Sequence, residues 1–268
     1  MRLLKIDEVQ GELLELMKKL HKFLEDNGIK YYLLGGSALG AIRHKGFIPW
    51  DDDIDIGMQR EDYEVFLRVS TTFNTSYEIV NFNKAKNCDF CLTRIYIPNT
   101  YVDIPAVRKT KLDHRLYLDI FPLDNVPDSK VELLKYESKL VKMKKLMQRI
   151  DVRDYGGGRI KLIAKKIFSF PLKLFRQQIL RHIDRFMKKY RDADTTCICS
   201  LSSQYSFSHQ VMNKTVYGTP ILLDFCDTKF YVPEKTEEYL TILFGADYMQ
   251  VPPPEKRRKG YDIYLIEE

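Results

Sequence analysis

A glycine turn that follows a short apolar segment, with acidic residues soon after it, most constrains the fold of this chain. Residues 30–34 (KYYLL) are rich in aromatic and aliphatic residues, as a strand is, and they end at Gly35-Gly36-Ser37. Glycine lets the backbone turn tightly there, and Ser37 is placed to cap a short helix that runs toward Arg43. Because N–H groups that open a helix bind anions, this turn predicts a phosphate site.

Two acidic residues share one face of the next predicted strand. Since strand side chains alternate between faces, Asp53 and Asp55 lie on one side, whereas Ile54 and Ile56 turn into the core. Neighbouring carboxylates repel each other unless a divalent cation neutralises them. Mg²⁺ prefers oxygen ligands of this kind, so the pair predicts a magnesium site beside the glycine turn.

A third carboxylate is expected from a neighbouring strand. Asp119 lies between Leu118 and Ile120 and repeats the pattern of apolar residue, acid and apolar residue. It could complete the metal site or accept a proton from an acceptor hydroxyl. Asp103 has the same setting, and the residues alone leave this choice open. A solvated acidic loop or a non-catalytic calcium site is the less favoured reading, because the acids follow a glycine turn so closely.

The predicted elements indicate an α+β fold, with a mixed sheet flanked by helices. Helices are expected over 6–27, 37–43, 62–69 and 236–244, and strands over 30–34, 54–56, 77–82, 92–97, 101–104, 116–121, 216–225 and 230–232. A capping box at Ser129 and Glu132 predicts a long helix, and Gly156-Gly157-Gly158 separates it from a second helical run over 160–190, bent at Pro171. We therefore expect a catalytic core over 1–128, a basic helical insert over 129–192 and a C-terminal part over 193–268 that completes the core.

Charge is concentrated in the predicted insert. Residues 130–191 contain 19 Lys and Arg against 5 Asp and Glu, so the remaining residues carry a net charge of −8. Large apolar residues alternate with these cations, namely Ile163, Ile167, Phe168, Phe170, Leu174 and Phe175. This pattern suits an interfacial helix on anionic lipid, and a solvated helix pair packed on the sheet is the alternative. No recognised nucleic-acid module accompanies the charge, so no nucleic-acid partner is expected.

The sequence predicts a cytoplasmic protein, peripheral at the inner face of a membrane if the insert binds lipid. Charges from Lys5 onward interrupt any secretory apolar region, and no later window reaches the apolar run of about 18 residues that a membrane span needs. The five cysteines are irregularly spaced, which favours free thiols in a reducing compartment. A zinc site is a weaker alternative, and its ligands would be Cys88 and Cys91 with Cys197, Cys199 or His209.

The same segments resemble the LicD family of phosphotransferases, which also includes the fukutin-related proteins. The resemblance spans roughly residues 8–126 and 210–260. Its motifs are GGS at 35–37, AIRHKGFIPWDDDIDIGM at 41–58, DIFPLD at 119–124, FGADYM at 244–249 and PPPEKR at 252–257. It implies a nucleotidyltransferase-type fold with an Asp-x-Asp strand. It also implies that Asp53, Asp55 and Asp119 are Mg²⁺ ligands, with Asp51 close by.

The resemblance further implies an activity. Such enzymes transfer phosphocholine, or a similar phospho-alcohol, from CDP-choline or another CDP-alcohol such as CDP-ribitol. The acceptor is a hydroxyl of a cell-surface glycan or its lipid-linked precursor, such as teichoic acid or lipopolysaccharide, and CMP is released. A nucleotidyltransferase that releases pyrophosphate and an inactive nucleotide- or glycan-binding module are the alternatives.

Further residues around the motifs are expected to bind the donor. Gly35, Gly36, Ser37 and Arg43 are predicted to bind its pyrophosphate oxygens, and His44 and Lys45 either neutralise phosphate or end a solvated helix. Trp50 is predicted to hold a trimethylammonium group or to cap the core, and Lys256 and Arg257 to fold over the nucleotide or to form an exposed tail.

Overall fold

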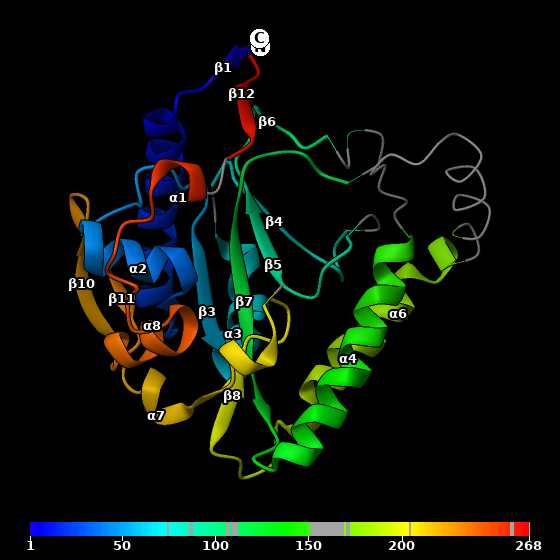
Figure 1. The fold of residues 1–268 in the computed structure, drawn as a ribbon. Helices are drawn as coiled ribbons and strands as arrows, with labels where there is room; N and C mark the ends of the chain where they lie inside the picture. Colours follow the sequence, from blue (N-terminus) through cyan, green and yellow to red (C-terminus); the bar gives the residue numbers. More distant parts are fainter. Residues whose placement is uncertain are drawn as a thin grey trace.

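The structure is a computed structural model that describes residues 1–73, 75–85, 88–105, 108, 112–150, 169, 172–203, 205–257 and 260–267. It confirms the predicted α+β class: helices pack around a mixed sheet, and a pair of long helices projects from one side (Figure 1). None of the helices in these described ranges is long and apolar enough to cross a lipid bilayer.

The main sheet is organised around one long strand. Its order is β2 (Tyr32–Leu33), β3 (Asp55–Gln59), β7 (Tyr117–Val126), β5 (Thr93–Tyr96) and β4 (Glu78–Asn81). Strands β3 and β7 are parallel, and the other neighbours are antiparallel. The end of β7 also pairs with β8 (Cys197–Cys199), which pairs with β9 (Met212–Asn213). Strand β7 therefore joins the early motifs to the C-terminal part of the chain.

Helix positions follow the apolar periodicity. Helix α1 (Ile6–Asp26) buries one apolar face, and α2 (Gly35–His44) and α3 (Arg60–Val69) follow β2 and β3. Helix α8 (Thr236–Phe244) has the predicted bounds and ends at Gly245, whose φ of 94° favours glycine. The remaining short helical turns are η1 (Ser70–Thr72), η2 (Lys188–Tyr190), η3 (Phe207–His209) and η4 (Pro254–Lys256).

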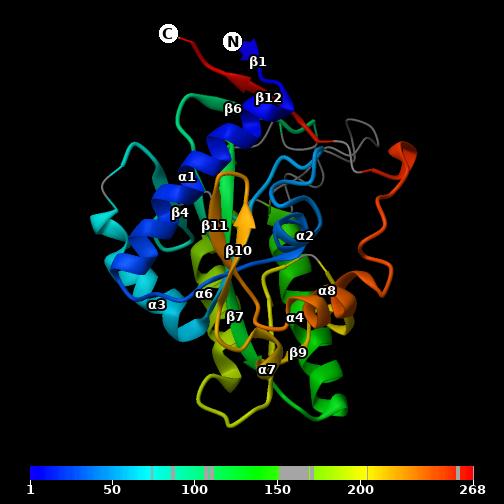
Figure 2. The ribbon, with the colours of Figure 1, turned by 90° about the vertical axis from the view of Figure 1, so that its left-hand side faces the viewer.

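Two smaller units complete the core. Strand β12 (Asp262–Leu265) lies between β1 (Arg2–Leu3) and β6 (Thr100–Asp103), so both ends of the chain lie side by side (Figure 2). Strands β10 (Ile221–Phe225) and β11 (Thr228–Val232) form a hairpin. The predicted strand over 216–225 is wrong at its start, because α7 (Lys214–Tyr217) occupies that position. The Asn213 side chain caps α7 by accepting from Thr215 N, and this local bond favours a helical turn.

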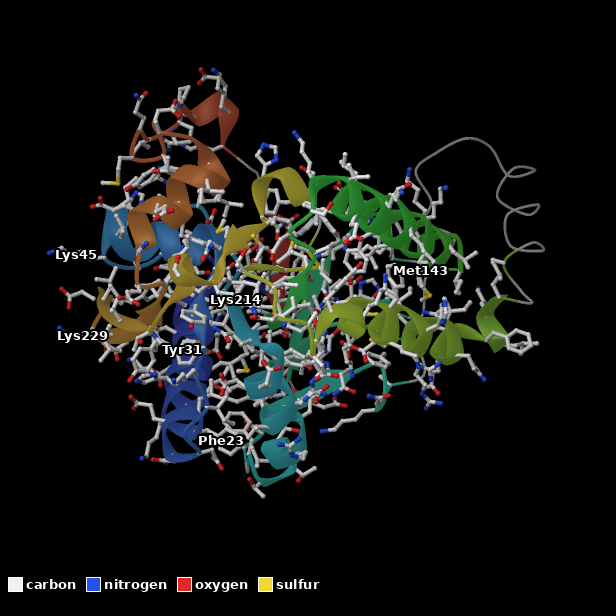
Figure 3. All side chains as sticks on the ribbon, turned by 90° about the horizontal axis from the view of Figure 1, so that it is seen from below. Phe23, Tyr31, Lys45, Met143, Lys214 and Lys229 are labelled. Carbon is white, nitrogen blue, oxygen red and sulfur yellow. The ribbon has the colours of Figure 1, made fainter. Side chains whose placement is uncertain are left out.

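The predicted insert contains a helix pair with its own apolar cluster. Helices α4 (Lys130–Ile150) and α6 (Arg176–Met187) lie side by side and bury residues such as Leu140 and Ile183 between them (Figures 1 and 3). The predictions for Gly156-Gly157-Gly158, Ile163, Ile167, Phe168, Phe170 and Pro171 concern residues outside the described ranges. The three proposed domain boundaries stay predictions.

A buried ionic cluster attaches this helix pair to the main sheet. Arg60, the first residue of α3, donates from Nε and Nη2 to the two carboxylate oxygens of Asp124 on β7, each at 2.6 Å. Its Nη1 donates to Asp184 Oδ1 on α6 at 3.2 Å. The Arg60 side chain is 3% exposed and that of Asp124 2%. Burial alone would lower the pKa of Arg60, but the two carboxylates outweigh it and raise the pKa.

Replacing Arg60 by Met should destabilise the fold by about 3–5 kcal/mol, because it leaves the buried Asp124 carboxylate without a partner. Arg60→Lys should be less harmful, since it keeps the charge and loses the two-pronged geometry. Urea unfolding followed by circular dichroism measures both variants. Equal stability of Arg60→Met and the parent chain would contradict the assigned role of the cluster.

Candidate active site

The register of β3 and β7 brings two of the predicted acids together. Asp55 pairs with Asp119 across these parallel strands, so both side chains lie on one sheet face, with backbones about 4.8 Å apart. Asp53 precedes β3 by two residues. Burial raises the pKa of Tyr117, and Asp119, Asp55 and Asp53 raise it further, so all three carboxylates lie near this phenol. The acids therefore gather at the start of β3 and β7.

Arg94 on β5 fixes the orientation of Asp119. Its Nε donates to Asp119 Oδ1 at 2.9 Å. The guanidinium carbon lies 3.9 Å from the centre of the Tyr117 ring and 4.2 Å from that of Phe90, so two aromatic rings hold it. Burial raises the pKa of Asp119, although Arg94 opposes this shift. The sequence alone did not predict a role for Arg94; a single cation in an otherwise uncharged strand was the available signal.

Ser37 links the glycine turn to the acidic strand. The prediction that it caps the helix is wrong: α2 begins at Gly35, Leu34 is the N-cap residue, and Ser37 lies inside the first turn. Its buried Oγ accepts a hydrogen bond from Asp55 N at 3.0 Å. Leu34 N also donates to Asp55 O at 2.9 Å. The start of α2 is thus bound to the start of β3.

The two glycines have different surroundings. Gly35 has a φ of 49°, and its N–H donates to the Tyr239 hydroxyl at 2.9 Å, so this amide already has an acceptor. A Cβ atom on Gly36 would lie 2.8 Å from Asp51 Oδ2, so the absence of a side chain lets this carboxylate approach the turn. Helix geometry leaves the N–H groups of Gly36 and Ser37 without intrahelical acceptors, and phosphate binding by these amides stays a prediction.

The three basic residues at the end of α2 make other contacts. Arg43 Nη1 donates to the carbonyl oxygens of Tyr248 at 2.9 Å and Gln250 at 3.2 Å, which joins α2 to the C-terminal tail. Burial and Arg43 lower the pKa of His44, so it is mainly neutral at pH 7. Lys45 has a φ of 52°, and its side chain points outward from the molecule (Figure 3). Phosphate binding by these residues stays a prediction.

The C-terminal tail folds back over the acidic loop. The Arg257 guanidinium carbon lies 4.2 Å from the centre of the Trp50 ring, and Tyr261 N donates to Asp52 Oδ2 at 3.1 Å. Lys256 is exposed beside it. Trp50 also packs against the main core, as one of the two predicted roles requires. A trimethylammonium group on this ring face would compete with the Arg257 guanidinium.

The other candidate ligands lie elsewhere or are engaged. Asp103 belongs to the small sheet, where it pairs with Asp262 across β12 and forms an ion pair with Arg108, so Asp119 is the acid beside Asp55. Burial raises the pKa of the Cys88 thiol to about 12, as for a core thiol. Cys91 donates its thiol proton to a helix carbonyl.

The donor types at the acidic cluster fit Mg²⁺. Asp53, Asp55 and Asp119 supply the hard oxygen ligands that this ion takes in proteins. Within the described ranges, no group of three or more His, Cys, Asp or Glu side chains is arranged closely enough to hold a metal ion. Arg94 also competes for Asp119. The strand register therefore suits the ion, and its binding would require these carboxylates to turn toward one another.

Comparison with known proteins connects this geometry to a family. Residues 28–160 match the family described as LicD/FKTN/FKRP, nucleotidyltransferase domain. The chain is 28% identical to the lipopolysaccharide cholinephosphotransferase LicD of Haemophilus influenzae, over 99% of this chain and 100% of that protein. It is 56% identical over 39 residues to human ribitol 5-phosphate transferase FKRP, covering 15% of this chain and 8% of that protein. An uncharacterized protein of Rickettsia prowazekii is 36% identical over 43% of this chain and 40% of its own length.

Two glycine substitutions in α2 should differ in their effect on stability. Alanine at either position gains about 1 kcal/mol of helix propensity. Gly40→Ala should nevertheless destabilise the protein by about 1–3 kcal/mol, because its Cβ would lie 2.4 Å from the backbone oxygen of Gly46. Gly36→Ala should keep the stability of the parent, since the displaced atom belongs to the Asp51 side chain. Urea unfolding of both variants compares them, and an equal loss in both would contradict this account of Gly36.

Proposed function

Because residues 28–160 match the LicD/FKTN/FKRP nucleotidyltransferase domain, we propose that this phosphotransferase uses a CDP-activated donor such as CDP-choline or a similar CDP-alcohol. It transfers the phospho-alcohol to a hydroxyl of a cell-surface glycan or its lipid-linked precursor and releases CMP. The supporting observation is the pairing of Asp55 with Asp119 directly beside the glycine turn. The names of the Haemophilus and human relatives describe transfer of a phospho-alcohol in both cases.

The residues divide into those that hold phosphate and those that hold the ion. The Gly36 and Ser37 amides bind donor phosphate oxygens at the start of α2, where the helix dipole favours negative charge. Asp53, Asp55 and Asp119 would hold Mg²⁺, which supplies neutralisation of the charge that spreads over the phosphoryl oxygens. Arg94 keeps Asp119 turned toward the shared face.

The reaction exchanges one phosphorus–oxygen bond for another. The acceptor hydroxyl oxygen attacks the alcohol-bearing phosphorus in line, and the bond from that phosphorus to the oxygen of CMP breaks. The hydroxyl proton passes to water, or to Asp119 if this carboxylate does not hold the ion. The bound phosphates and the shared carboxylate face position the reacting groups.

The outer face of α4 gives the enzyme a means to approach lipid-linked acceptors. Val131, Leu134 and Val141 are 62%, 57% and 37% exposed, and Lys142 and Lys145 are exposed on the same helix. Positions three, four and seven apart lie on one helix face, so this apolar row is flanked by cations. Such a face suits the interface of an anionic membrane. Leu174 and Phe175, just before α6, are also exposed, at 68% and 57%.

A product assay tests the proposed activity. With Mg²⁺, a CDP-alcohol panel and a glycan acceptor, the parent chain should release CMP, and chelation with EDTA should stop the release. Asp53→Asn should lower the rate at least about 100-fold, because it removes an ion ligand and its charge. Asp103→Asn is the matched control, since this acid lies on the small sheet. Chromatographic detection of CMP measures all of these rates.

Other products of this assay would identify the alternatives. Release of pyrophosphate from a nucleoside triphosphate would indicate a nucleotidyltransferase. Nucleotide binding with no turnover of any donor would indicate a binding module. Full activity of Asp53→Asn would refute the assigned role of the acidic face.

Vesicle sedimentation tests the outer face of α4. The parent chain should bind phosphatidylglycerol vesicles more strongly than phosphatidylcholine vesicles. Each lysine near an anionic surface contributes about 1 kcal/mol, so Lys135→Glu, Lys142→Glu and Lys145→Glu combined should weaken binding about 100-fold or more. The control combines Lys22→Glu, Lys229→Glu and Lys235→Glu; Lys229 lies on the opposite side from Met143 of α4 (Figure 3). Equal binding by both triple variants would exclude this surface.

A further inference from the structure

A pocket adjoins the acidic face on the side of the C-terminal part of the chain. Gly35 and Asp55 line it, together with residues of the segment that follows β8, drawn in yellow in Figure 1. Its cavity volume is small, about 40 Å³, and the pocket opens toward solvent. Because Asp55 belongs both to this pocket and to the proposed ion site, a group bound here lies next to the transferred phosphate.

One buried hydroxyl in this pocket has no partner. Ser200 is 7% exposed, and its Oγ forms no hydrogen bond with any part of the chain that the structure describes. Its backbone oxygen accepts from Ser203 N at 3.2 Å, so the carbonyl has a partner while the hydroxyl does not. A buried hydroxyl without a partner costs about 1–3 kcal/mol, and a ligand that supplies the missing hydrogen bond recovers this energy.

Apart from Asp55, the polar side chains that the structure describes in the pocket wall are neutral. Buried Gln210 donates from Nε2 to Ser203 Oγ at 2.8 Å. The Tyr239 hydroxyl accepts from Gly35 N and keeps its own proton to donate. Among the described lining residues, Asp55 has the only charged side chain. The lining also includes aromatic rings, of which Phe121 is one. The wall thus combines hydroxyls, an amide and aromatic faces, with no cation that would bind phosphate.

This lining discriminates between chemical classes of ligand. A trimethylammonium group can neither donate nor accept a hydrogen bond, so it would leave Ser200 unpaired. The hydroxyls of a sugar or a sugar alcohol do both. Building on the proposed function, we infer that this pocket binds a hydroxyl-rich carbon chain or ring beside Asp55, with Ser200 as a hydrogen-bonding partner. The ligand is the alcohol part of the donor or the sugar of the acceptor.

Calorimetry and NMR with Ser200→Ala test this inference. Since the hydroxyl is unpaired in the free protein, Ser200→Ala should unfold at the same temperature as the parent or higher. Its affinity for a hydroxyl-rich ligand should fall about tenfold, as expected for one lost hydrogen bond. The probes are CDP-ribitol, CDP-choline and CMP by calorimetry, and free ribitol, galactose and N-acetylglucosamine by ligand-observed NMR. Ser202→Ala is the matched control, because its hydroxyl donates to Cys91 O and does not line the pocket.

The outcomes distinguish the donor alcohol from the acceptor sugar as the ligand. They also distinguish failure of the pocket inference from failure of the proposed reaction. Weaker binding of CDP-ribitol alone assigns the pocket to the donor alcohol, and weaker binding of the free sugars alone assigns it to the acceptor. Unchanged binding of every probe, or an equal loss for CDP-choline and CMP, overturns the inference. The NMR arm needs no turnover, so a failed CMP-release assay with intact Ser200-dependent sugar binding would reject the proposed reaction and keep the pocket.

Discussion

The parallel pairing of β3 with β7 is the constraint on which the site depends. At one end of this pair Asp55 lies beside Asp119, and at the other end Arg60, which follows β3 directly, binds Asp124 on β7. Both ends are therefore fixed by polar contacts, while Ile56 is fully buried between them. A shift of the strand register by one residue would turn the Ile56 side chain outward. The same shift would separate Asp55 from Asp119 and break the buried ion pair. Catalytic geometry and fold stability are thus set by the same register.

Local sequence patterns were sufficient to predict individual strands and helices. Alternation at Ile54 and Ile56 predicted the acidic strand, and the apolar run before Gly245 predicted α8 to the residue. Pairing across the sheet was less accessible, since several strands carry a similar signal and Asp103 resembled Asp119 until register placed it on another sheet. Ser37 was read as a cap because serine is common there, whereas its hydroxyl serves a tertiary contact with Asp55 N.

The remaining site residues depend on contacts between distant parts of the chain. The position of Arg94 matters because its strand pairs with β7, which carries Asp119. The position of Ser200 matters because it lines a pocket together with residues of α8. Neither lies in a motif that a sequence pattern would reveal. The LicD-family match ends at residue 160, yet the pocket continues into the C-terminal part of the chain. The pocket wall therefore includes residues that lie outside the matched family domain.

The tail that folds over the acidic loop couples two positions that are far apart in the chain. A Cβ atom on Gly260 would lie 2.8 Å from Asp52 Oδ2, and the adjacent Tyr261 amide binds the same oxygen. A larger residue at 260 therefore requires the Asp52 carboxylate to turn away, residue 52 to become smaller or the tail to move. Across related sequences these two sites should change in a correlated manner, and a bulky residue at 260 should accompany a shortened side chain at 52.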